Sequence, residues 1–543
     1  MLEKVFIFPV SSGIICVAFI LRSLKGEFFD VVMKKEKKKR GFLSSFSICF
    51  LVVLLAAILS WIIPAGAYDT LVYDEGANEF VVYSADYDED AGTGTATNYP
   101  ATQETLDNFG ITAGLDNFTN GNIYKPMSIP GTYQKVEAHH QGLKEFLASP
   151  VQGTADGFDI IFFILMLGGT IGVINYIGAF NAGIGALAKS CKGREQIILI
   201  AVTALIALAG TVEGFCEETI ALYPVLVPVF LAAGYDAITA VGAIYMGSTI
   251  GCMFSTINPF SVGIASYAAG TSMNAGLGFR VVGLVIGTII TILYLMRYAK
   301  KIKKDPEKSL VYDQRDLVHE KFSAIDMENI PEFTPRRKLA LLAFVVTFAI
   351  MILGIMKLGW WFEELSILFM CSGVVIGIIG GIGEKNIVRE FVAGAADLVG
   401  VALILGVARA VTILLDNGNI SGTILEGLSK AVSGMPPAVF LVLLMLVYVI
   451  LGFFINSSSG LAVLSIPIMA PLADIVGIPR ELIVSAYVYG LGIITFITPT
   501  GIVMPSLEVV ETTYDRWLRL AMPLVCILTV WGAIMLCIQL AFC

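Results

Sequence analysis

The chain of 543 residues has a hydrophobic fraction of 56% and a mean hydropathy of +0.81, more than a soluble globular protein of this length carries. Only 15% of the residues are charged, and the net charge of -9 comes mostly from one acidic segment, so we expect no nucleic-acid partner. Apolar runs recur, each near the ~20 residues that cross a bilayer. The composition therefore excludes a soluble protein and favours an all-α polytopic membrane protein.

The inventory of reactive side chains argues against an enzyme. The three histidines, His139, His140 and His319, lie outside the apolar runs, and neither an HExxH nor a Walker A pattern occurs. The nine cysteines lie in or beside apolar runs, where a thiol behaves as a small apolar group. We therefore expect no enzyme, no disulfide framework and no cofactor.

The N-terminal part begins with residues 1–32, which we interpret either as an upstream extension or as an extra helix. A basic run at 33–40 follows, and then the first transmembrane helix within 41–66. Basic residues beside a span stay in the cytoplasm, so this helix should leave it. Residues 67–150 are acidic and poor in lysine and arginine, and we expect an extracytoplasmic segment there. It could be a lid or small subdomain, or it could capture substrate.

Further apolar runs follow in chain order. The run 158–177 should return to the cytoplasm, where Lys189, Lys192 and Arg194 lie, and the runs 197–209 and 281–295 come next. Beyond the acidic segment we expect a first repeat at 151–298, a basic cytoplasmic linker at 299–338, scaffold helices at 339–391 and a second repeat at 392–543.

An internal repeat supports this division. At a shift of 243 residues, Pro224 and Pro228 coincide with Pro467 and Pro471. At the same shift Gly234, Ala243 and Gly247 coincide with Gly477, Ala486 and Gly490; at a shift of 241, Gly153, Asp156 and Lys189 coincide with Gly394, Asp397 and Lys430. Chance matches between apolar sequences rarely pair prolines at equal spacing. The charges place the two copies in opposite orientation, and such an inverted repeat is typical of secondary transporters.

Each half contains a polar interruption of the kind that forms a re-entrant hairpin. In the first half the interruption is 213–219, with Glu213, Glu217 and Glu218, and in the second it is 456–460. A break in the next apolar run follows each hairpin: the first break is 255–259 and the second break is 498–501. Proline and hydroxyl residues free backbone carbonyls there, and such oxygens suit Na⁺. Two kinked structural helices are the alternative.

Charged residues inside the membrane are functional candidates because burying a charge is costly. Glu213 could instead lie at the interface, and Arg409 could either pair with an acid or hold a substrate carboxylate. Three carboxylates in one tip favour a cation, a proton or an amino group over a purely anionic substrate.

The sequence resembles the YfcC family over about residues 41–543. The motifs that carry this resemblance are 130–133, 153–163, 217–224, 232–236, 255–260, 408–409, 417–420 and 498–501. The family belongs to the ion-transporter superfamily, beside DcuC-type C4-dicarboxylate carriers and arginine/ornithine antiporters. The resemblance implies a scaffold, a transport domain with hairpins at 213–233 and 456–476, elevator-type motion and a homodimer. The chain departs from the family at Phe215 and Cys216, where methionine and a small residue are expected.

The sequence thus predicts a secondary transporter of the bacterial cytoplasmic membrane, whose partners are the lipid bilayer and a small-molecule substrate. The expected substrate is a basic amino acid, moved by antiport or by coupling to Na⁺ or H⁺; a C4-dicarboxylate or short-chain carboxylate carrier and a gated channel are the alternatives. The candidate substrate-binding residues are Glu217, Glu218, Thr219, Asn258, Arg409, Asn456, Ser457, Ser458 and Thr500. The candidate ion-binding residues are Glu213, Ser255, Thr256, Ser459 and Thr498.

Overall fold

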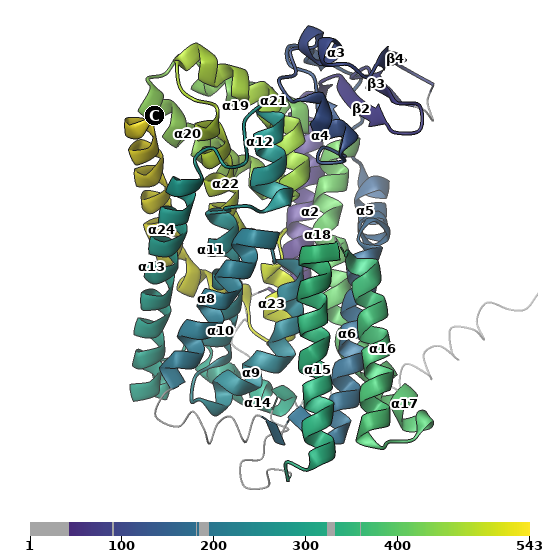
Figure 1. The fold of residues 1–543 in the computed structure, drawn as a ribbon, viewed down its shortest axis with the longest axis vertical. Coiled ribbons are helices and arrows are strands. Elements are labelled where there is room, and N and C mark those ends of the chain that lie inside the picture. The colour runs from purple at the N-terminus through teal and green to yellow at the C-terminus, as the bar shows by residue number, and fades with distance from the viewer. Residues whose placement is uncertain (1–42, 89–91, 181, 184–194, 323–331, 359) are drawn as a thin grey trace, which may run out of the picture. The chain divides into compact units, whose positions relative to one another are not determined.

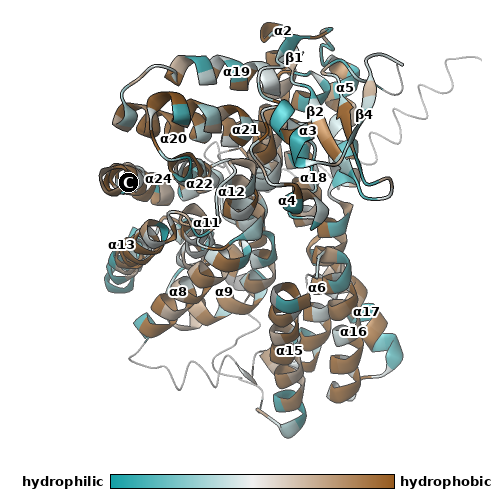
Figure 2. Ribbon diagram, turned by 45° about the horizontal axis from the view of Figure 1, so that its top comes forward, coloured by the Kyte–Doolittle hydropathy of each residue, from teal (hydrophilic) through white to brown (hydrophobic). Residues whose placement is uncertain are grey.

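The computed structural model describes residues 43–88, 92–180, 182–183, 195–322, 332–358 and 360–543. Within these ranges, nine helices are long and apolar enough to cross a membrane. Many of their large apolar side chains, such as Leu51, Leu293 and Val530, are exposed, as expected of helices that face lipid. In Figure 2 the ribbons of α16 (Phe362–Gly380), α20 (Pro437–Phe454) and α24 (Tyr514–Phe542) are coloured mostly as hydrophobic. The chain is therefore a multi-pass integral membrane protein.

The remaining elements are drawn in Figure 1. The other helices are α2 (Ser45–Ile62), α3 (Gln103–Asn108), α4 (Leu115–Thr119), α5 (Leu143–Asp156), α6 (Phe158–Ile177), α8 (Glu195–Glu213), α9 (Tyr223–Ala232), α10 (Ala237–Val241), α11 (Gly247–Met253), α12 (Ile264–Ala268), α13 (Leu277–Lys304), α14 (Arg315–Phe322), α15 (Pro335–Leu353), α17 (Glu384–Asp397), α18 (Val399–Asn417), α19 (Ser421–Val432), α21 (Ser458–Val476), α22 (Glu481–Thr495) and α23 (Val503–Val509). The 3₁₀ turns are Glu217–Leu222, Pro306–Lys308 and Tyr312–Gln314, and the π-helical turns are Gly242–Met246, Pro259–Gly263 and Gly354–Leu358. The strands are β1 (Gly66–Ala67), β2 (Thr70–Asp74), β3 (Glu79–Tyr83), β4 (Ala96–Pro100), β5 (Met127–Ser128) and β6 (Gln134–Lys135).

The internal repeat relates the elements of the two halves in order. Helices α5, α6, α8 and α9 correspond to α17, α18, α20 and α21, and the segments α10–α11, α12 and α13 correspond to α22, α23 and α24. The first helix of each copy packs against the other copy, α5 on α18 and α17 on α6. Glycine permits both approaches, because a Cβ at Gly153 or at Gly394 would lie 2.2 Å from a carbonyl oxygen of the opposite helix. The repeats therefore interlock.

Each half contains a hairpin that enters and leaves at one end of the molecule. Glu195, at the start of α8, forms an ion pair with Lys303 at 3.1 Å, and the same ammonium lies over the Tyr235 ring just beyond α9. The start of the first arm and the end of the second arm therefore share one end of the bundle. In the second half α20 runs parallel to α22, with Gly452 of α20 against Ile494 of α22. Because α21 connects these two parallel helices in the chain, it must run in the opposite direction and form a hairpin with α20. Both elements are re-entrant hairpins, as predicted.

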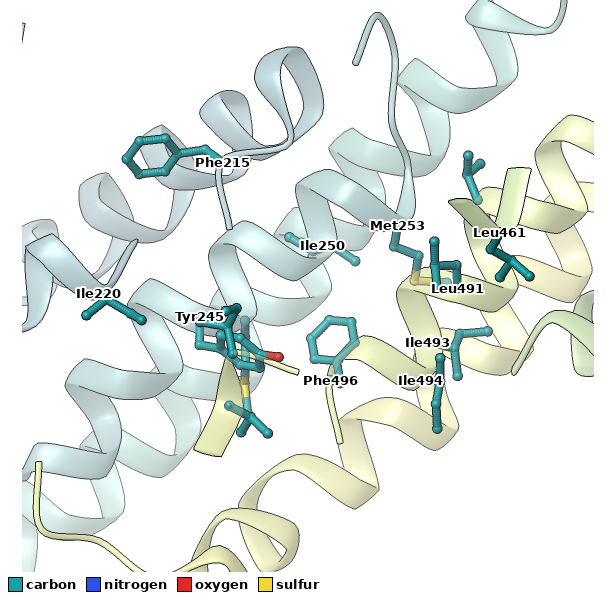
Figure 3. Close-up of a cluster of buried hydrophobic side chains, with 14 of the residues drawn as sticks. Phe215, Ile220, Tyr245, Ile250, Met253, Leu461, Leu491, Ile493, Ile494 and Phe496 are labelled. Atoms are coloured by element: carbon teal, nitrogen blue, oxygen red, sulfur yellow. The ribbon is translucent and has the colours of Figure 1, made fainter. Parts of the chain in front are cut away.

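The two halves meet in opposite orientation along α11 and α22. The Tyr245 hydroxyl, just before α11, donates to the Thr495 carbonyl at the end of α22. Met253 comes later in the chain than Tyr245, but it lies against Gly492, which comes earlier than Thr495. The helices therefore run antiparallel, which confirms the inverted repeat. Figure 3 shows side chains of both halves, including Tyr245 and Phe496, in one buried apolar cluster.

The helices form two groups. The scaffold group comprises α2, α5, α6 and α15–α18, and the hairpin group comprises α8–α13 and α20–α24 (Figure 1). Contacts between the groups include the 3₁₀ turn Glu217–Leu222 against α6, and α23 against α2 and α18. The first hairpin tip and the helix that follows the break at 498–501 thus lie beside the scaffold group.

The acidic segment folds as a subdomain, residues 66–142, which we call the cap. Its core is an antiparallel sheet in the order β4-β3-β2-β5, an element that the all-α prediction lacked. The cap contacts both helix groups: β5 packs against α21 of the hairpin group, and the Trp61 indole of α2 in the scaffold group donates to the Gln141 carbonyl at 3.1 Å. It lies at the end of the bundle opposite to the lysine-rich end of α13 (Figure 1). Which end faces the cytoplasm stays a prediction.

Several predicted boundaries differ from the structure. Helix α5 crosses the boundary between 67–150 and 151–298, because it begins at Leu143. The span predicted from residue 392 is divided into α17 and α18 at Leu398, since α17 is amphipathic and belongs to the repeat. The linker 299–338 includes the end of α13, α14 and the start of α15. Residues 1–32 and the basic group at 189–194 lie outside the described residues.

Candidate functional site

The first tip is a tight turn between α8 and the 3₁₀ turn Glu217–Leu222. Helix α8 ends at Glu213, and Gly214 takes a positive φ of 72°, which favours glycine. The Glu218 carboxylate accepts a hydrogen bond from the Cys216 amide at 3.1 Å. Glu213 and Glu217 both act electrostatically on Glu218. The glutamates that the sequence places in this tip therefore act on one another electrostatically.

The first break packs directly against this tip. A Cβ on Gly214 would lie 2.6 Å from Nδ2 of Asn258, whose Oδ1 accepts from the Phe260 amide. The Thr211 hydroxyl, at the end of α8, bonds the Thr256 hydroxyl at 3.1 Å and the Phe254 carbonyl at 3.0 Å. Three oxygens of the broken helix and the hairpin arm thus lie within one buried group.

The second half repeats this arrangement with different residues. The Thr500 hydroxyl donates to the Phe453 carbonyl at 3.2 Å, and the Asn456 amide donates to the Thr500 carbonyl at 3.3 Å. Thr498 and Thr500 share a hydrogen bond of 2.7 Å between their hydroxyls. Ser457 caps α21 by accepting from the Gly460 amide. Hydroxyls of each break therefore bond the neighbouring hairpin arm in both halves.

The remaining contacts concern four further candidates. Thr219 donates to the Cys216 carbonyl and is fully buried, so it shapes the turn. Ser255 donates to the Cys252 carbonyl at 2.7 Å. The Ser458 carbonyl accepts from the Tyr487 hydroxyl, while Ser459 is buried in the first turn of α21. Among these, only Ser255 belongs to a break, where it also accepts from the Ser261 hydroxyl.

Arg409 connects the scaffold group to the first tip. Its guanidinium pairs with the Asp156 carboxylate at 2.5 Å and also donates to the Asp156 carbonyl at 3.1 Å. The pair is not sealed off, because the Arg409 side chain is 35% exposed. Glu217 lies within electrostatic reach of both Arg409 and Asp159. The guanidinium therefore pairs with an acid, and its exposed part is available to a second anion.

Three charged residues near the tips were not identified as site residues from the sequence. Asp156 was noted only as a marker of the repeat, and Asp159 only as part of a family motif. Lys125 of the cap donates from Nζ to the Ser457 hydroxyl at 3.2 Å, 332 residues away in sequence. Burial and the nearby charge of Arg409 lower the pKa of Lys125. Its position in an acidic external segment gave no signal for this contact.

The breaks present hydroxyl and carbonyl oxygens close to the hairpin arms. Among the described residues, no group of three His, Cys, Asp or Glu side chains is arranged to hold a metal. The hydroxyl and carbonyl oxygens around Thr211 and Thr256, and those around Thr498 and Thr500, are the kind that unwound helices offer to Na⁺ in inverted-repeat transporters.

Comparison with known proteins identifies relatives over nearly the whole chain. A sequence model of the family described as "DcuC: C4-dicarboxylate anaerobic carrier" matches residues 42–541. An "Uncharacterized protein" of Haemophilus influenzae is 48% identical over 93% of this chain and 98% of its own length. The "Putative basic amino acid antiporter YfcC" of Escherichia coli is 30% identical over 90% of this chain and 94% of its own.

Among solved structures, the YdaH transporter of Alcanivorax borkumensis covers 92% of this chain and 98% of its own, at 16% identity and a TM-score of 0.35. The predicted resemblance to the YfcC family is confirmed by the sequence relatives.

Proposed function

Because the chain belongs to the DcuC family of carriers and is a membrane transporter, we propose that it exchanges basic amino acids, such as arginine for ornithine. The observation that carries this proposal is the opposition of charges at the hairpin tips. Glu213, Glu217 and Glu218 lie together at the first tip, and Arg409 of the scaffold group acts electrostatically on Glu217. A substrate with two cationic groups and one carboxylate matches this arrangement.

The roles of the residues follow from charge. Glu217 and Glu218 would bind the cationic side chain, since an ammonium or guanidinium replaces the solvation that buried carboxylates lack. Arg409 would bind the substrate carboxylate with the part of its guanidinium that Asp156 leaves free. Asn258, Asn456 and Thr500 would line the space between the two tips.

Movement of the hairpin group past the scaffold group would expose the site to the two sides in turn. The proposed site lies where the two groups touch, with Arg409 on the scaffold group and the glutamates on the hairpin group. A substrate bound between them would neutralise opposite charges and favour the movement. The oxygens around Thr256 and Thr498 could hold Na⁺ if the exchange is coupled to an ion.

A C4-dicarboxylate is the second candidate substrate, because the family description names it and Arg409 could bind one of its carboxylates. The three glutamates oppose this, since like charges repel strongly where the dielectric is low. The basic amino acid is therefore the better match.

Counterflow into proteoliposomes distinguishes the two candidates. Vesicles loaded with ornithine should take up radiolabelled arginine faster than empty vesicles, and external succinate should not compete. Vesicles containing the E217Q/E218Q double variant serve as the control for leakage. Succinate counterflow without arginine uptake would overturn the proposal in favour of a dicarboxylate carrier.

A further inference from the structure

Lys125 reaches the second hairpin tip from a firmly held segment of the cap. Ile123 and Met127, two residues before and two residues after Lys125, have side chains in the cap core that are 3% and 0% exposed. Pro126 restricts the backbone between Lys125 and Met127. Strand β5 pairs with β2 and packs against α21. The position of the ammonium is therefore set by the fold of the cap rather than by a freely moving loop.

One positive and one negative side chain act on the Lys125 ammonium, so the three groups together carry one net positive charge. Nζ donates to Ser457, and a Cβ at Gly460 would lie 3.9 Å from it. The charges that act on Lys125 are those of Arg409 and Asp156. Asp156 already pairs with Arg409 at 2.5 Å, so its carboxylate is not left free for Lys125. A partly buried excess of positive charge is unfavourable unless an anion approaches it.

The anion that fits this place is a carboxylate of the transported substrate. Lys125 and Arg409 approach from the cap and from α18, and the free hydrogen-bonding positions of both could meet on one carboxylate. The glutamates of the first tip belong to the other hairpin, and Arg409 acts electrostatically on one of them, Glu217. The two ends of a basic amino acid would thus meet opposite charges.

We propose that Lys125 is a specificity-determining residue, which together with Arg409 restricts transport to substrates that carry a carboxylate. This inference rests on the proposed function, because it assigns the carboxylate of the exchanged amino acid to the Lys125 side of the site. An amine of the same shape without the carboxylate would leave Lys125 and Arg409 repelling each other. Such an amine should bind weakly to the unmodified protein.

Arginine and agmatine, its decarboxylated counterpart, form the test pair. In ornithine-loaded proteoliposomes, K125M should raise the KM for arginine about 10-fold, as expected from loss of one charge-assisted contact, with a smaller change in kcat. The inhibition constant of agmatine should change less than about 2-fold, because agmatine has no carboxylate to lose. K125R should restore most of the affinity for arginine. K135M changes an exposed lysine of the same cap and should change neither constant.

Several outcomes would overturn the proposal. An equal rise in both constants would make Lys125 a structural residue of the cap, and an unchanged KM for arginine would remove its role altogether. If K125M does not fold, as judged by size-exclusion profile and thermal unfolding, K125Q replaces it with the same expectations. If the unmodified protein exchanges succinate instead of arginine, the proposed function fails while the Lys125 proposal is tested on succinate. A 10-fold rise in KM for succinate would then support it and an unchanged value would overturn it.

Discussion

The two hairpin tips hold equivalent places in the repeat but differ in chemistry. The first follows Glu213 with a glycine at positive φ and a 3₁₀ turn that carries Glu217 and Glu218. The second has no acid, and an α-helix begins at once under the cap of Ser457. In both halves a threonine hydroxyl links the break to the hairpin arm. The two halves thus share the link between break and hairpin arm, whereas their tips differ. The proposed site is negative at the first tip and polar without an acid at the second.

Two charged groups outside the tips complete this asymmetry. Arg409 of the scaffold group acts on the acidic tip, and Lys125 of the cap contacts the neutral one. A site with distinct ends orients its ligand, because a reversed amino acid would place its carboxylate against glutamates. The following experiments would break or sharpen the comparison between the tips.

Neutralising the acidic tip should have the largest effect. E217Q and E218Q should each lower arginine counterflow by about 10- to 100-fold, because a charge-assisted contact to the cation is lost. Initial uptake rates in ornithine-loaded proteoliposomes measure this change. The control E75Q, on the exposed surface of the cap, should transport at the normal rate. Normal transport by both tip variants would show that the glutamates do not bind the substrate.

Breaking the Arg409–Asp156 pair should have the next largest effect. R409Q should raise the KM for arginine about 10-fold, and D156N should raise it less, because the guanidinium keeps its charge. The double variant should be less impaired than the product of the two single effects, since the residues act as a pair. Thermal unfolding should hardly change, because a partly exposed ion pair contributes only about 0.2–1 kcal/mol. Strictly multiplicative effects on KM would argue against the pair.

The packing of α11 and α22 against the first arms of the two hairpins should differ in sensitivity. A Cβ at Gly490 would lie 2.3 Å from the Met445 carbonyl oxygen, whereas at Gly247 the Thr203 oxygen is 3.0 Å away. G490A should therefore destabilise the protein by about 1–3 kcal/mol. In G247A the crowding is milder, and its cost should nearly cancel the gain of about 1 kcal/mol from the better helix propensity of alanine. Thermal unfolding in detergent compares them, with G427A in α19 as a control whose Cβ meets nothing. Equal loss in G490A and G247A would contradict the packing difference.

The pH dependence should show the smallest effect. Burial and the charge of Arg409 lower the pKa of Lys125, whose other close neighbours are Asp156 and the uncharged Ser457. The ammonium form binds a carboxylate and is present below that pKa, so the KM for arginine should rise earlier on the alkaline side than an ordinary lysine would allow. In K125R this rise should move to higher pH, because arginine stays charged.

The KM for arginine, measured with equal pH on both sides of the vesicle, tests this shift. The α-amino group of the substrate titrates identically with both proteins, so the difference between them isolates Lys125. Identical alkaline profiles for the wild type and K125R would contradict the assignment.

The sequence alone determined the membrane class, the inverted repeat and both hairpins with their breaks. These features depend on local properties, namely apolar runs of spanning length and the placement of Pro224, Pro228, Pro467 and Pro471. The glutamates of the first tip were also predictable, because charge within an apolar run is costly and therefore informative. The cap sheet was missed because its strands are short and the segment was interpreted by charge alone.

Only the tertiary structure decided which charges meet. Arg409 pairs with Asp156 across 253 residues, and Lys125 meets Ser457 across 332, because the cap and the interlocked repeats bring these segments together. Periodicity and composition carry no information about such distances, since each residue fits its own segment equally well with other partners. The repeat can therefore be recognised from local features of the sequence, namely apolar runs and proline spacing. The distribution of charge across the proposed site depends instead on how the two halves and the cap pack together.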